Sequence, residues 1–414
     1  MPRTIHIIGA GLAGLAAAVE LASRNEMVVV HEATSVAGGR CRSYYDRSIG
    51  MTIDNGNHLL LSGNAAALSY LRSIGAGDRL VGPPSAEFSF HDFASGERWV
   101  LSLNSGRLPW WIFDSRRRVP GSRAADYLPM ARLLFASRDK TVGEVIRPEG
   151  VVYQRLVRPV LLAALNLDPP DGSAALAGAI VRETLAAGGK ACRPLIARDG
   201  LSQVFIEPAL AYLAAHNAAV HLEHQLHAIR FTDKSVQALD FGRDGVMVAL
   251  GDAVVLAVPP YAAASLFPEI EVPNAFSPIV NAHFRIEPPT GCPPILGVLN
   301  ATTEWLFAFP GRLSVTISGA ERLIDTPRQT LAQTIWQEVS AITGLPSELP
   351  PWQIVRERRA TFAATPEQDA RRPPARTRWA NLALAGDWTD TGLPATIESA
   401  IRSGRRAAAL IRQD

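Results

Sequence analysis

The sequence predicts an α/β (α+β) fold in which a dinucleotide-binding domain is interleaved with a domain made of a mixed sheet and helices. The first observation is a glycine pattern, Gly9-x-Gly11-x-x-Gly14, between an apolar run and an alanine-rich segment. The second is another glycine-containing segment, Leu384 to Glu398, near the other end of the chain. The third is the length of 414 residues, which suits two or three domains rather than one core.

The N-terminal part of the chain is typical of a βαβ unit. Residues 4–9 are a short apolar run that ends in glycine, residues 12–24 show helical apolar spacing, and residues 27–31 are rich in valine. We expect a loop and a strand between residues 38 and 61, followed by a helix over residues 65–75. The glycine pattern therefore falls on the turn between the first strand and the first helix.

Each glycine of this turn has its own role in holding a dinucleotide. Gly9 allows the tight turn, Gly11 lets the backbone approach a pyrophosphate, and Gly14 lets the helix pack closely on the strand. The phosphates would lie at the helix N-terminus, where unpaired N–H groups and the helix dipole favour negative charge. We therefore expect Leu12 and Ala13, the first helical residues, to belong to the phosphate site.

An acid and a second glycine loop extend this site. Glu32 closes the second predicted strand, where its carboxylate can accept hydrogen bonds from the adenosine ribose and disfavours a 2′-phosphate. Gly38 and Gly39 allow a further backbone approach, and the guanidinium of Arg40 can bind phosphate through two N–H groups.

The C-terminal segment predicts the other end of the same cofactor. Gly386 and Asp387 follow an apolar run, and Asp387 can bind ribityl hydroxyls. Thr396 and Ile397 open a helix whose N–H groups would face the flavin pyrimidine edge and stabilise the anionic reduced flavin. Because most of the chain separates the two halves, they predict one long cofactor, FAD, in a Rossmann-like domain of the glutathione-reductase type.

The middle of the chain alternates between two kinds of amino-acid composition. Residues 81–190 are rich in aromatic residues, proline and arginine, with helical segments predicted at 127–137 and 151–165. We expect a discontinuous FAD-binding domain at 1–80, 191–260 and 375–414. The substrate-binding domain then comprises residues 81–190 and 261–374.

Composition excludes several classes of function. The net charge is only +2, so nothing global favours nucleic acid as a partner. Three scattered cysteines form neither a disulfide framework nor a metal-ligand spacing, and we expect no metal. No leader pattern precedes the first strand, and the longest apolar stretch is interrupted by Pro259 and Pro260. We expect a cytoplasmic protein with at most a peripheral contact to the inner face of the cytoplasmic membrane.

With both halves of the FAD pattern in place, the sequence resembles the FAD-dependent amine oxidase and phytoene desaturase superfamily over nearly its full length. Within it, four segments resemble the squalene-associated FAD-dependent desaturases, now understood as hydroxysqualene dehydroxylases: 54–60, 163–166, 198–202 and 392–398. The resemblance implies reduction of hydroxysqualene to squalene by reduced FAD, in squalene and hopanoid biosynthesis.

The resemblance also implies particular contacts to FAD. It implies that Leu226 gives backbone contacts to adenine. The order of elements in residues 38–61 separately predicts a second approach to the cofactor, at Gly56, Asn57 and His58. Two positions depart from the pattern. Asn57 stands where we expect glutamine, and Ser399 stands where the superfamily usually has glycine, which we expect to perturb the helix near the flavin slightly.

The implied reaction breaks an allylic C–O bond, so an acid must let hydroxide leave as water. His58 and Asp54 are the first candidates, because their segment returns to the flavin and a histidine can be protonated near neutral pH. The alternatives are that His58 only hydrogen-bonds the backbone or flavin, and that Asp54 is a structural cap. Tyr153 and His283 are weaker candidates.

Aromatic residues predict walls that could stabilise a cation. Trp305, Phe307 and Phe309 have period two, which places them on one face of a strand. Ordinary core packing is the alternative. A second strand face combines three polar residues, with a solvated or sheet-edge surface as the alternative: Asn281, His283 and Arg285.

Residues 107–140 form a candidate membrane-facing lid. Eight basic residues and only three acids accompany aromatic and aliphatic side chains there, including Trp110 and Trp111. This combination suits shallow docking on anionic lipid headgroups, through which a hydrophobic isoprenoid would reach the site. An internal lid helix with solvated arginines is the alternative.

Three other functions compete with dehydroxylation. An oxidative desaturase of a phytoene-like isoprenoid shares the fold and cofactor but starts from oxidised flavin. An amine or porphyrinogen oxidase is the second, and its amine oxidase form is disfavoured because no lysine follows Lys234, whereas many amine oxidases use a later lysine near the flavin. A non-catalytic flavin-binding partner of an isoprenoid synthase is the last of these functions.

No second glycine pattern identifies the electron donor that reduces the flavin. A separate reductase or transient NAD(P)H binding would serve.

Overall fold

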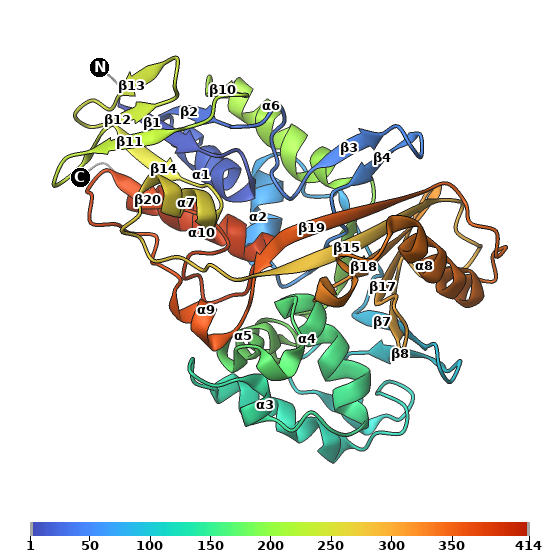
Figure 1. Ribbon diagram of the computed structural model, residues 1–414. Helices are drawn as coiled ribbons and strands as arrows, with labels where there is room; N and C mark the ends of the chain where they lie inside the picture. Colours follow the sequence, from blue (N-terminus) through green and yellow to red (C-terminus); the bar gives the residue numbers. More distant parts are fainter. Residues whose placement is uncertain (1–2, 412–414) are drawn as a thin grey trace.

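A five-stranded parallel sheet gathers strands from both ends and the middle of the chain (Figure 1). The computed structural model describes residues 3–411. Every strand pair in this sheet is parallel, and its central strands are buried apolar runs, as expected for a sheet covered on both faces. In spatial order its strands are β10 (Ala219–His221), β2 (Met27–His31), β1 (Thr4–Ile8), β14 (Ala253–Leu256) and β20 (Leu382–Leu384).

The first and the last helices pack against each other beside this sheet. They are α1 (Leu12–Ala22) and α10 (Ile397–Leu410), which contact closely. A Cβ atom on Gly404 of α10 would lie 2.1 Å from the carbonyl oxygen of Ala13, so only glycine permits this approach. The C-terminal helix is thereby held at the glycine turn.

A seven-stranded mixed sheet forms the second large unit. Helix α8 (Arg328–Thr343) covers one of its faces, where Val280, Leu313 and Val315 pack with Trp336. All strand pairs are antiparallel except the one between β16 and β7. In spatial order the strands are β19 (Trp352–Phe362), β15 (Phe276–Arg285), β18 (Arg312–Ile317), β17 (Trp305–Phe309), β16 (Ile295–Leu299), β7 (Glu87–Asp92) and β8 (Arg98–Ser102).

A helical layer lies below the seven-stranded sheet in the view of Figure 1. The segment predicted as a helix at 127–137 is instead the 3-10 helix η2 (Ala124–Phe135), in which Pro129 lacks the N–H group that an α-helix would need. The prediction at 151–165 is confirmed, with one π-helical turn inside it. The elements of this layer are η1 (Trp110–Phe113), α3 (Val142–Val145), η3 (Tyr153–Val157), α4 (Arg158–Leu165), η4 (Pro169–Asp171), α5 (Ala174–Glu183), η5 (Leu185–Ala187) and η6 (Gly189–Ala191).

Smaller elements connect these units. A hairpin pairs β3 (Ser43–Asp46) with β4 (Met51–Asp54), and a second small sheet has the order β5 (Leu59–Leu61), β9 (Pro194–Ala197), β6 (Leu80–Val81). A third contains β11 (Ala228–Phe231), β12 (Val236–Asp240) and β13 (Gly245–Met247). The remaining helices are α2 (Ala65–Ser73), η7 (Ser202–Ile206), α6 (Glu207–Ala215), α7 (Pro260–Leu266), η8 (Ala320–Leu323) and α9 (Pro366–Ala370). No helix within residues 3–411 has both the length and the apolar character that a bilayer crossing requires.

Candidate functional site

The glycine turn leaves the N-terminus of α1 open. Gly9 has φ of +104°, and a Cβ atom there would lie 2.6 Å from the carbonyl oxygen of Ala257. Gly11 is the N-cap of α1 and has no side-chain cap, while a Cβ atom on it would meet no described atom within 4 Å. Gly39 lies beside it, because a Cβ on Gly39 would be 3.5 Å from the Cα of Gly11. The two glycine loops thus border an open helix N-terminus, which suits a phosphate.

Glu32 is held at the edge of this turn. It is buried, its Oε2 accepts a hydrogen bond from the N–H of Ala10 at 2.7 Å, and its Oε1 accepts the Thr34 N–H at 3.0 Å. The N–H of His224 donates to the Glu32 carbonyl oxygen at 2.8 Å, and Leu226 is buried two residues farther along. A fixed carboxylate, which can accept hydrogen bonds, next to an open helix N-terminus, which can donate them, fits the adenosine half of a dinucleotide.

The C-terminal segment meets the second glycine loop. The guanidinium of Arg40 lies 2.7 Å from the Oδ1 of Asp387 and also donates to the carbonyl oxygen of Ala360 at 2.6 Å. Arg40 therefore binds a carboxylate in this structure, where the sequence predicted a phosphate. Thr396 caps α10 by accepting the N–H of Ser399 at 3.1 Å, so α10 begins at Ile397 as predicted. The two ends of the predicted FAD pattern are joined by this ion pair.

Two residues of the C-terminal motif have structural roles that sequence reasoning did not assign. Glu398 caps α2, because its carboxylate oxygens accept the N–H groups of Ala66 at 3.0 Å and Ala67 at 2.9 Å. Ser399 is fully buried, and its hydroxyl lies 2.7 Å from that of Thr391. Helix α10 runs through Ser399 without a break, so the expected perturbation is not observed.

One face of the seven-stranded sheet combines the two residue groups that the sequence placed on separate strands. The register aligns Asn281 with Thr316 and Thr316 with Trp305. Two residues along each strand, His283 pairs with Ser314 and Ser314 with Phe307. Because side chains on neighbouring strands at matched positions share a face, the polar row and the aromatic row lie on the same surface. We call this surface the site face.

The polar part of the site face is buried. Asn281 is 1% exposed and His283 is 0% exposed, so a solvated surface is wrong for these two, although Arg285 is exposed. The Nδ1 of His283 lies 2.8 Å from the Ser314 hydroxyl. Burial and, to a smaller extent, the nearby Arg312 together lower the pKa of His283 to about 3. His283 is therefore neutral near pH 7 and has no extra proton to donate.

The aromatic part of the site face is also buried. Trp305, Phe307 and Phe309 belong to the apolar cluster that continues into the helical layer. The rings of Phe307 and Phe309 are nearly parallel, with centroids 6.3 Å apart. The guanidinium of Arg312 lies 4.4 Å from the Phe309 ring centroid, so one cation already occupies that ring.

Asp54 is an acceptor for three separate segments. It is 2% exposed and accepts the Ser43 hydroxyl at 2.6 Å, the Leu201 N–H at 2.8 Å and the Arg312 guanidinium at 3.3 Å. Leu201 belongs to segment 198–202, so two of the segments that carried the family resemblance meet at this carboxylate. This full set of partners favours a structural role for Asp54 over proton donation.

Asn57 and His58 continue from Asp54 toward the site face. The Asn57 amide Nδ2 donates to the Thr316 hydroxyl at 3.0 Å, whereas its Oδ1 is buried and has no partner within the described chain. Burial lowers the pKa of His58 to about 4, although Asp54 opposes this shift. His58 is therefore neutral near pH 7.

Tyr153 differs from the histidines. Burial and, to a smaller extent, Asp168 raise the pKa of Tyr153 to about 12, so the phenol keeps its proton. Its hydroxyl is buried and has no partner among the described residues. Tyr153 therefore keeps its phenol proton at neutral pH and has a buried hydroxyl without a partner among the described residues; the Nε2 of His283 is likewise buried without one.

Asn166 explains a third segment of the resemblance. It ends α4 in a left-handed conformation with φ of +53°. Its Nδ2 donates to the carbonyl oxygen of Ser277 and to the hydroxyl of Thr361, both at 3.0 Å, and its Oδ1 accepts the Gly319 N–H at 2.8 Å. Segment 163–166 therefore joins the helical layer to the seven-stranded sheet.

The candidate lid carries an exposed apolar surface. Trp110 and Phe113 are each 64% exposed, and their ring centroids are 6.1 Å apart. Trp111, which the sequence grouped with Trp110, is only 5% exposed and packs edge-on against Tyr127. Successive side chains of the 3-10 turn point in different directions, which explains the difference. We define the aromatic surface as five exposed residues: Leu108, Trp110, Phe113, Leu128 and Phe135.

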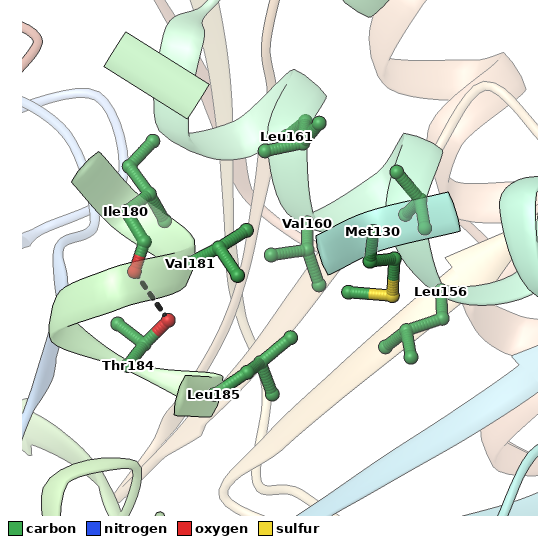
Figure 2. A pocket seen from close by; sticks show the side chains of 9 residues that line it. Met130, Leu156, Val160, Leu161, Ile180, Val181, Thr184 and Leu185 are labelled. Atoms are coloured by element: carbon green, nitrogen blue, oxygen red, sulfur yellow. Dashed lines mark hydrogen bonds between the residues drawn. The ribbon is translucent and has the colours of Figure 1, made fainter. Parts of the chain in front are cut away.

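An apolar cavity lies on the inner side of η2 (Figure 2). Met130 of η2 and Val160 of α4 line it on one side, opposite Val181 of α5 and Leu185 of η5. Its volume is about 10 Å³, which suits about one water molecule. A hydrocarbon chain can enter only if these flexible side chains move.

Comparisons with known proteins agree with this architecture. Residues 12–412 match the family described as flavin containing amine oxidoreductase. Cyclohexylamine oxidase from Brevibacterium oxydans has a similar fold, with a TM-score of 0.71, 18% identity and 99% of each chain covered. A hydroxysqualene dehydroxylase of Rhodopseudomonas palustris is 59% identical, with 99% of each chain covered. One of Sinorhizobium fredii is 57% identical, covering 99% of this chain and 98% of its own. This chain therefore belongs to the hydroxysqualene dehydroxylase family, within the flavin-containing amine oxidoreductases.

Proposed function

We propose that this chain is an FAD-dependent oxidoreductase that removes the hydroxyl group of hydroxysqualene and yields squalene, in squalene and hopanoid biosynthesis. The observation that carries the proposal is the 59% identity to a hydroxysqualene dehydroxylase over nearly the whole of both chains. The meeting of segments 54–60 and 198–202 at the carboxylate of Asp54 supports it. A dehydroxylation of this kind needs a hydride, a proton and a site that excludes water.

We propose that FAD binds along the line from the glycine turn to α10. The N–H groups of Leu12 and Ala13 would hold its pyrophosphate, the carboxylate of Glu32 its ribose, and the backbone of Leu226 its adenine. The flavin end would lie at Asp387, Thr396 and Ile397, near Gly56, Asn57 and His58. Segments 1–80, 191–260 and 375–414 would form this FAD-binding domain, with 81–190 and 261–374 as the substrate-binding domain.

FAD in its reduced form supplies the hydride when it is bound. The C–O bond of the substrate breaks with its electron pair on oxygen, one proton converts the leaving hydroxide to water, and the hydride completes the new C–H bond. Trp305 and Phe307 would stabilise the intervening allylic cation through their ring faces, worth about 0.5–2 kcal/mol each. Phe309 is less available, because Arg312 already lies over its ring.

The source of the proton that converts the leaving hydroxide to water is the least obvious feature of the site. His58 and His283 are neutral near pH 7, and Asp54 is tied to Arg312. We propose that His58 and Asp54 orient the polar end of the site, and that Tyr153 is the group best able to donate a hydrogen bond to the leaving oxygen. Replacing Tyr153 with phenylalanine would test this role without changing the volume of the core.

One experiment separates the proposed activity from its main rival. The purified flavoprotein is reduced without oxygen, hydroxysqualene is added, and both flavin reoxidation and squalene formation are followed. Dehydroxylation predicts that the two signals rise together in equal amounts. A flavin that stays reduced, with no squalene formed, contradicts the proposal, whereas desaturation of phytoene by the oxidised enzyme supports the rival function.

We propose that the aromatic surface docks on the membrane that dissolves the substrate. Exposed arginines flank its five apolar side chains, among them Arg107, Arg116 and Arg132. Each basic residue near an anionic lipid surface adds about 1 kcal/mol of attraction. Met130 lies on the same helix as Leu128 but lines the cavity, so the surface and the apolar cavity are two sides of one element. The exposure of Trp110 and Phe113 favours this docking over an internal lid.

A further inference from the structure

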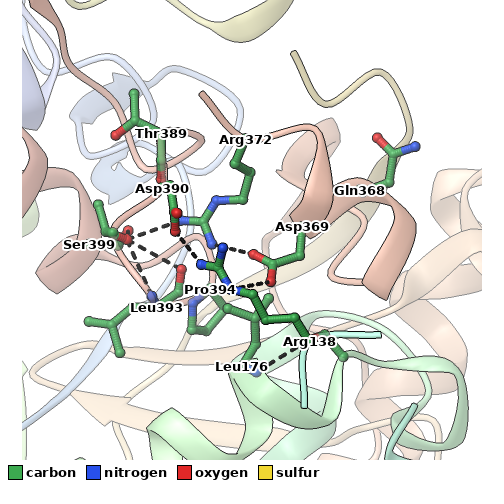
Figure 3. Close-up of polar contacts among 12 residues, drawn as sticks. Arg138, Leu176, Gln368, Asp369, Arg372, Thr389, Asp390, Leu393, Pro394 and Ser399 are labelled. Carbon is green, nitrogen blue, oxygen red and sulfur yellow. Dashed lines mark hydrogen bonds and ion pairs between the residues drawn. The ribbon is translucent and has the colours of Figure 1, made fainter. Parts of the chain in front are cut away.

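A buried arginine lies behind the loop that carries Asp387. The side chain of Arg372 is fully buried, and its Nη1 donates to Asp369 at 2.8 Å (Figure 3). Its Nη2 donates to the loop at the Thr389 carbonyl oxygen (2.6 Å), the Thr391 hydroxyl (3.0 Å) and the Asp387 carbonyl oxygen (3.3 Å). One guanidinium therefore binds this loop at three points.

Three other arginines also reach the loop, from distant parts of the chain. Arg40 binds the Asp387 side chain, Arg138 lies 2.5 Å from the Asp390 carboxylate, and Arg406 donates to the Asp390 carbonyl oxygen at 2.9 Å. These three are half-exposed or exposed, so water competes with each contact. Arg372 alone among the four is sealed from solvent, so its hold on the loop is the firmest.

The contacts of Arg372 continue to the start of α10. The Thr391 hydroxyl that Arg372 binds lies 2.7 Å from the hydroxyl of Ser399. Ser399 also donates its N–H to the Thr396 cap at 3.1 Å and its hydroxyl to the Asp387 carbonyl oxygen at 3.4 Å. The superfamily usually has glycine at this position, and glycine would lack the hydroxyl. The departure at Ser399 therefore adds a link between Arg372 and the N-terminus of α10.

Stability alone does not account for a buried charge here. A buried ion pair is often no more stabilising than apolar residues of the same volume, because both charges lose their hydration. What the guanidinium provides is geometry, since its planar fork fixes the directions of several acceptors at once.

We propose that Arg372 is a positioning residue for the cofactor, which acts through Thr391 and Ser399 to fix Asp387 and the N-terminus of α10 where they hold the flavin end of FAD. The inference rests on the proposed FAD site and is independent of the identity of the substrate.

The test compares FAD dissociation constants, measured from the fluorescence of released flavin, across matched variants. Arg372→Gln should weaken FAD binding about tenfold or more, as expected for loss of buried charged hydrogen bonds. Arg372→Lys keeps the charge but loses the fork, and should not restore the affinity. Ser399→Gly should weaken binding about threefold. Arg138→Gln is the exposed control and should leave the dissociation constant within about twofold.

Hydrogen exchange of the loop separates positioning from general stability. Faster exchange at residues 387–391 in the FAD-loaded Arg372→Gln variant, with the rest of the fold protected, supports the proposal. An unchanged FAD dissociation constant in a folded Arg372→Gln protein overturns it. If that variant does not fold, Thr391→Val removes the shared hydroxyl at nearly constant volume, and unchanged affinity there overturns the proposal equally. Normal FAD binding without dehydroxylation would contradict the proposed function and leave this inference standing.

Discussion

The two halves of the candidate site differ in the groups that form them: backbone atoms in one and side chains in the other. The half around α1 presents backbone N–H groups, glycines and one carboxylate, and it depends on atoms that approach within van der Waals distance. The site face presents side chains from three neighbouring strands, which are buried but joined by adjustable hydrogen bonds. Adding one atom to the backbone half should therefore abolish either its packing or its binding of FAD. Substitutions in the side-chain half should instead lower the unfolding free energy by smaller, graded amounts.

Two glycine substitutions should produce the largest effects. One tests the room needed for close packing of the protein backbone, and the other tests the room left for the cofactor. In Gly14→Ala the new Cβ would lie 1.9 Å from the Gly9 carbonyl oxygen, so we expect loss of about 3–5 kcal/mol of unfolding free energy. In Gly11→Ala the new Cβ meets no described atom, so the apoprotein should keep its Tm but lose FAD, because the methyl group would occupy the space proposed for the pyrophosphate.

Thermal unfolding of the apoprotein and flavin content measure these two outcomes. Gly245→Ala is the control, because its Cβ would also meet open space but lies far along the chain from the glycine turn. Full FAD retention in Gly11→Ala would show instead that the backbone half tolerates an added atom.

Asp54→Asn tests the side-chain half at its most buried charge. Removing the carboxylate leaves the guanidinium of Arg312 buried without a counter-charge, which should cost about 3 kcal/mol of unfolding free energy. Asp325→Asn, in the exposed pair with Arg358, should cost less than about 1 kcal/mol. Urea unfolding at pH 7 measures both, and equal costs would show that Asp54 and Arg312 are not coupled in the way described.

The buried histidine of the site face predicts a pH dependence of stability. The folded-state pKa of His283 is about 3, whereas the unfolded chain has the ordinary value near 6.5. The unfolded state therefore binds more protons between these values, so unfolding free energy falls as pH decreases from about 6.5, by up to about 1.4 kcal/mol per pH unit for this residue.

His283→Gln should reduce that slope between pH 5 and 6.5, as measured by urea unfolding at several pH values. His216→Gln, an exposed histidine on the surface, is the matched control. An unchanged slope in His283→Gln would mean that other titrating groups control the acid sensitivity of the fold.

The smallest effect on the folded protein should come from the aromatic surface. The double variant Trp110→Ala and Phe113→Ala removes two exposed rings, so stability should change little while sedimentation with anionic vesicles falls about fivefold. Tyr45→Ala, another exposed aromatic at 63% exposure, should leave vesicle binding unchanged. Equal vesicle binding by the unmodified protein, the double variant and Tyr45→Ala would exclude this surface as the membrane contact.

The same contrast explains what could be predicted from the sequence. The glycine turn is local, so spacing alone placed Gly9, Gly11 and Gly14 at the start of a helix. The pairing of Asp54 with Arg312 joins residues that are 258 positions apart, and no local pattern identifies that partner. The period-two spacing of Trp305 and Phe307 gave a strand face correctly. That Asn281 and His283 share this face follows only from the register of three strands, which depends on packing against α8.

The contact between α1 and α10 also bears on how the protein is made. A ribosome synthesises α1 early, but Gly404 and the edge strand β20 emerge only after nearly all other described residues. During most of translation the first βα unit therefore lacks its covering helix, and its apolar surface has to be tolerated or shielded in the growing chain. The proposed FAD site, which includes the start of α10, is consequently complete only after the last helix has been synthesised and has packed against the first.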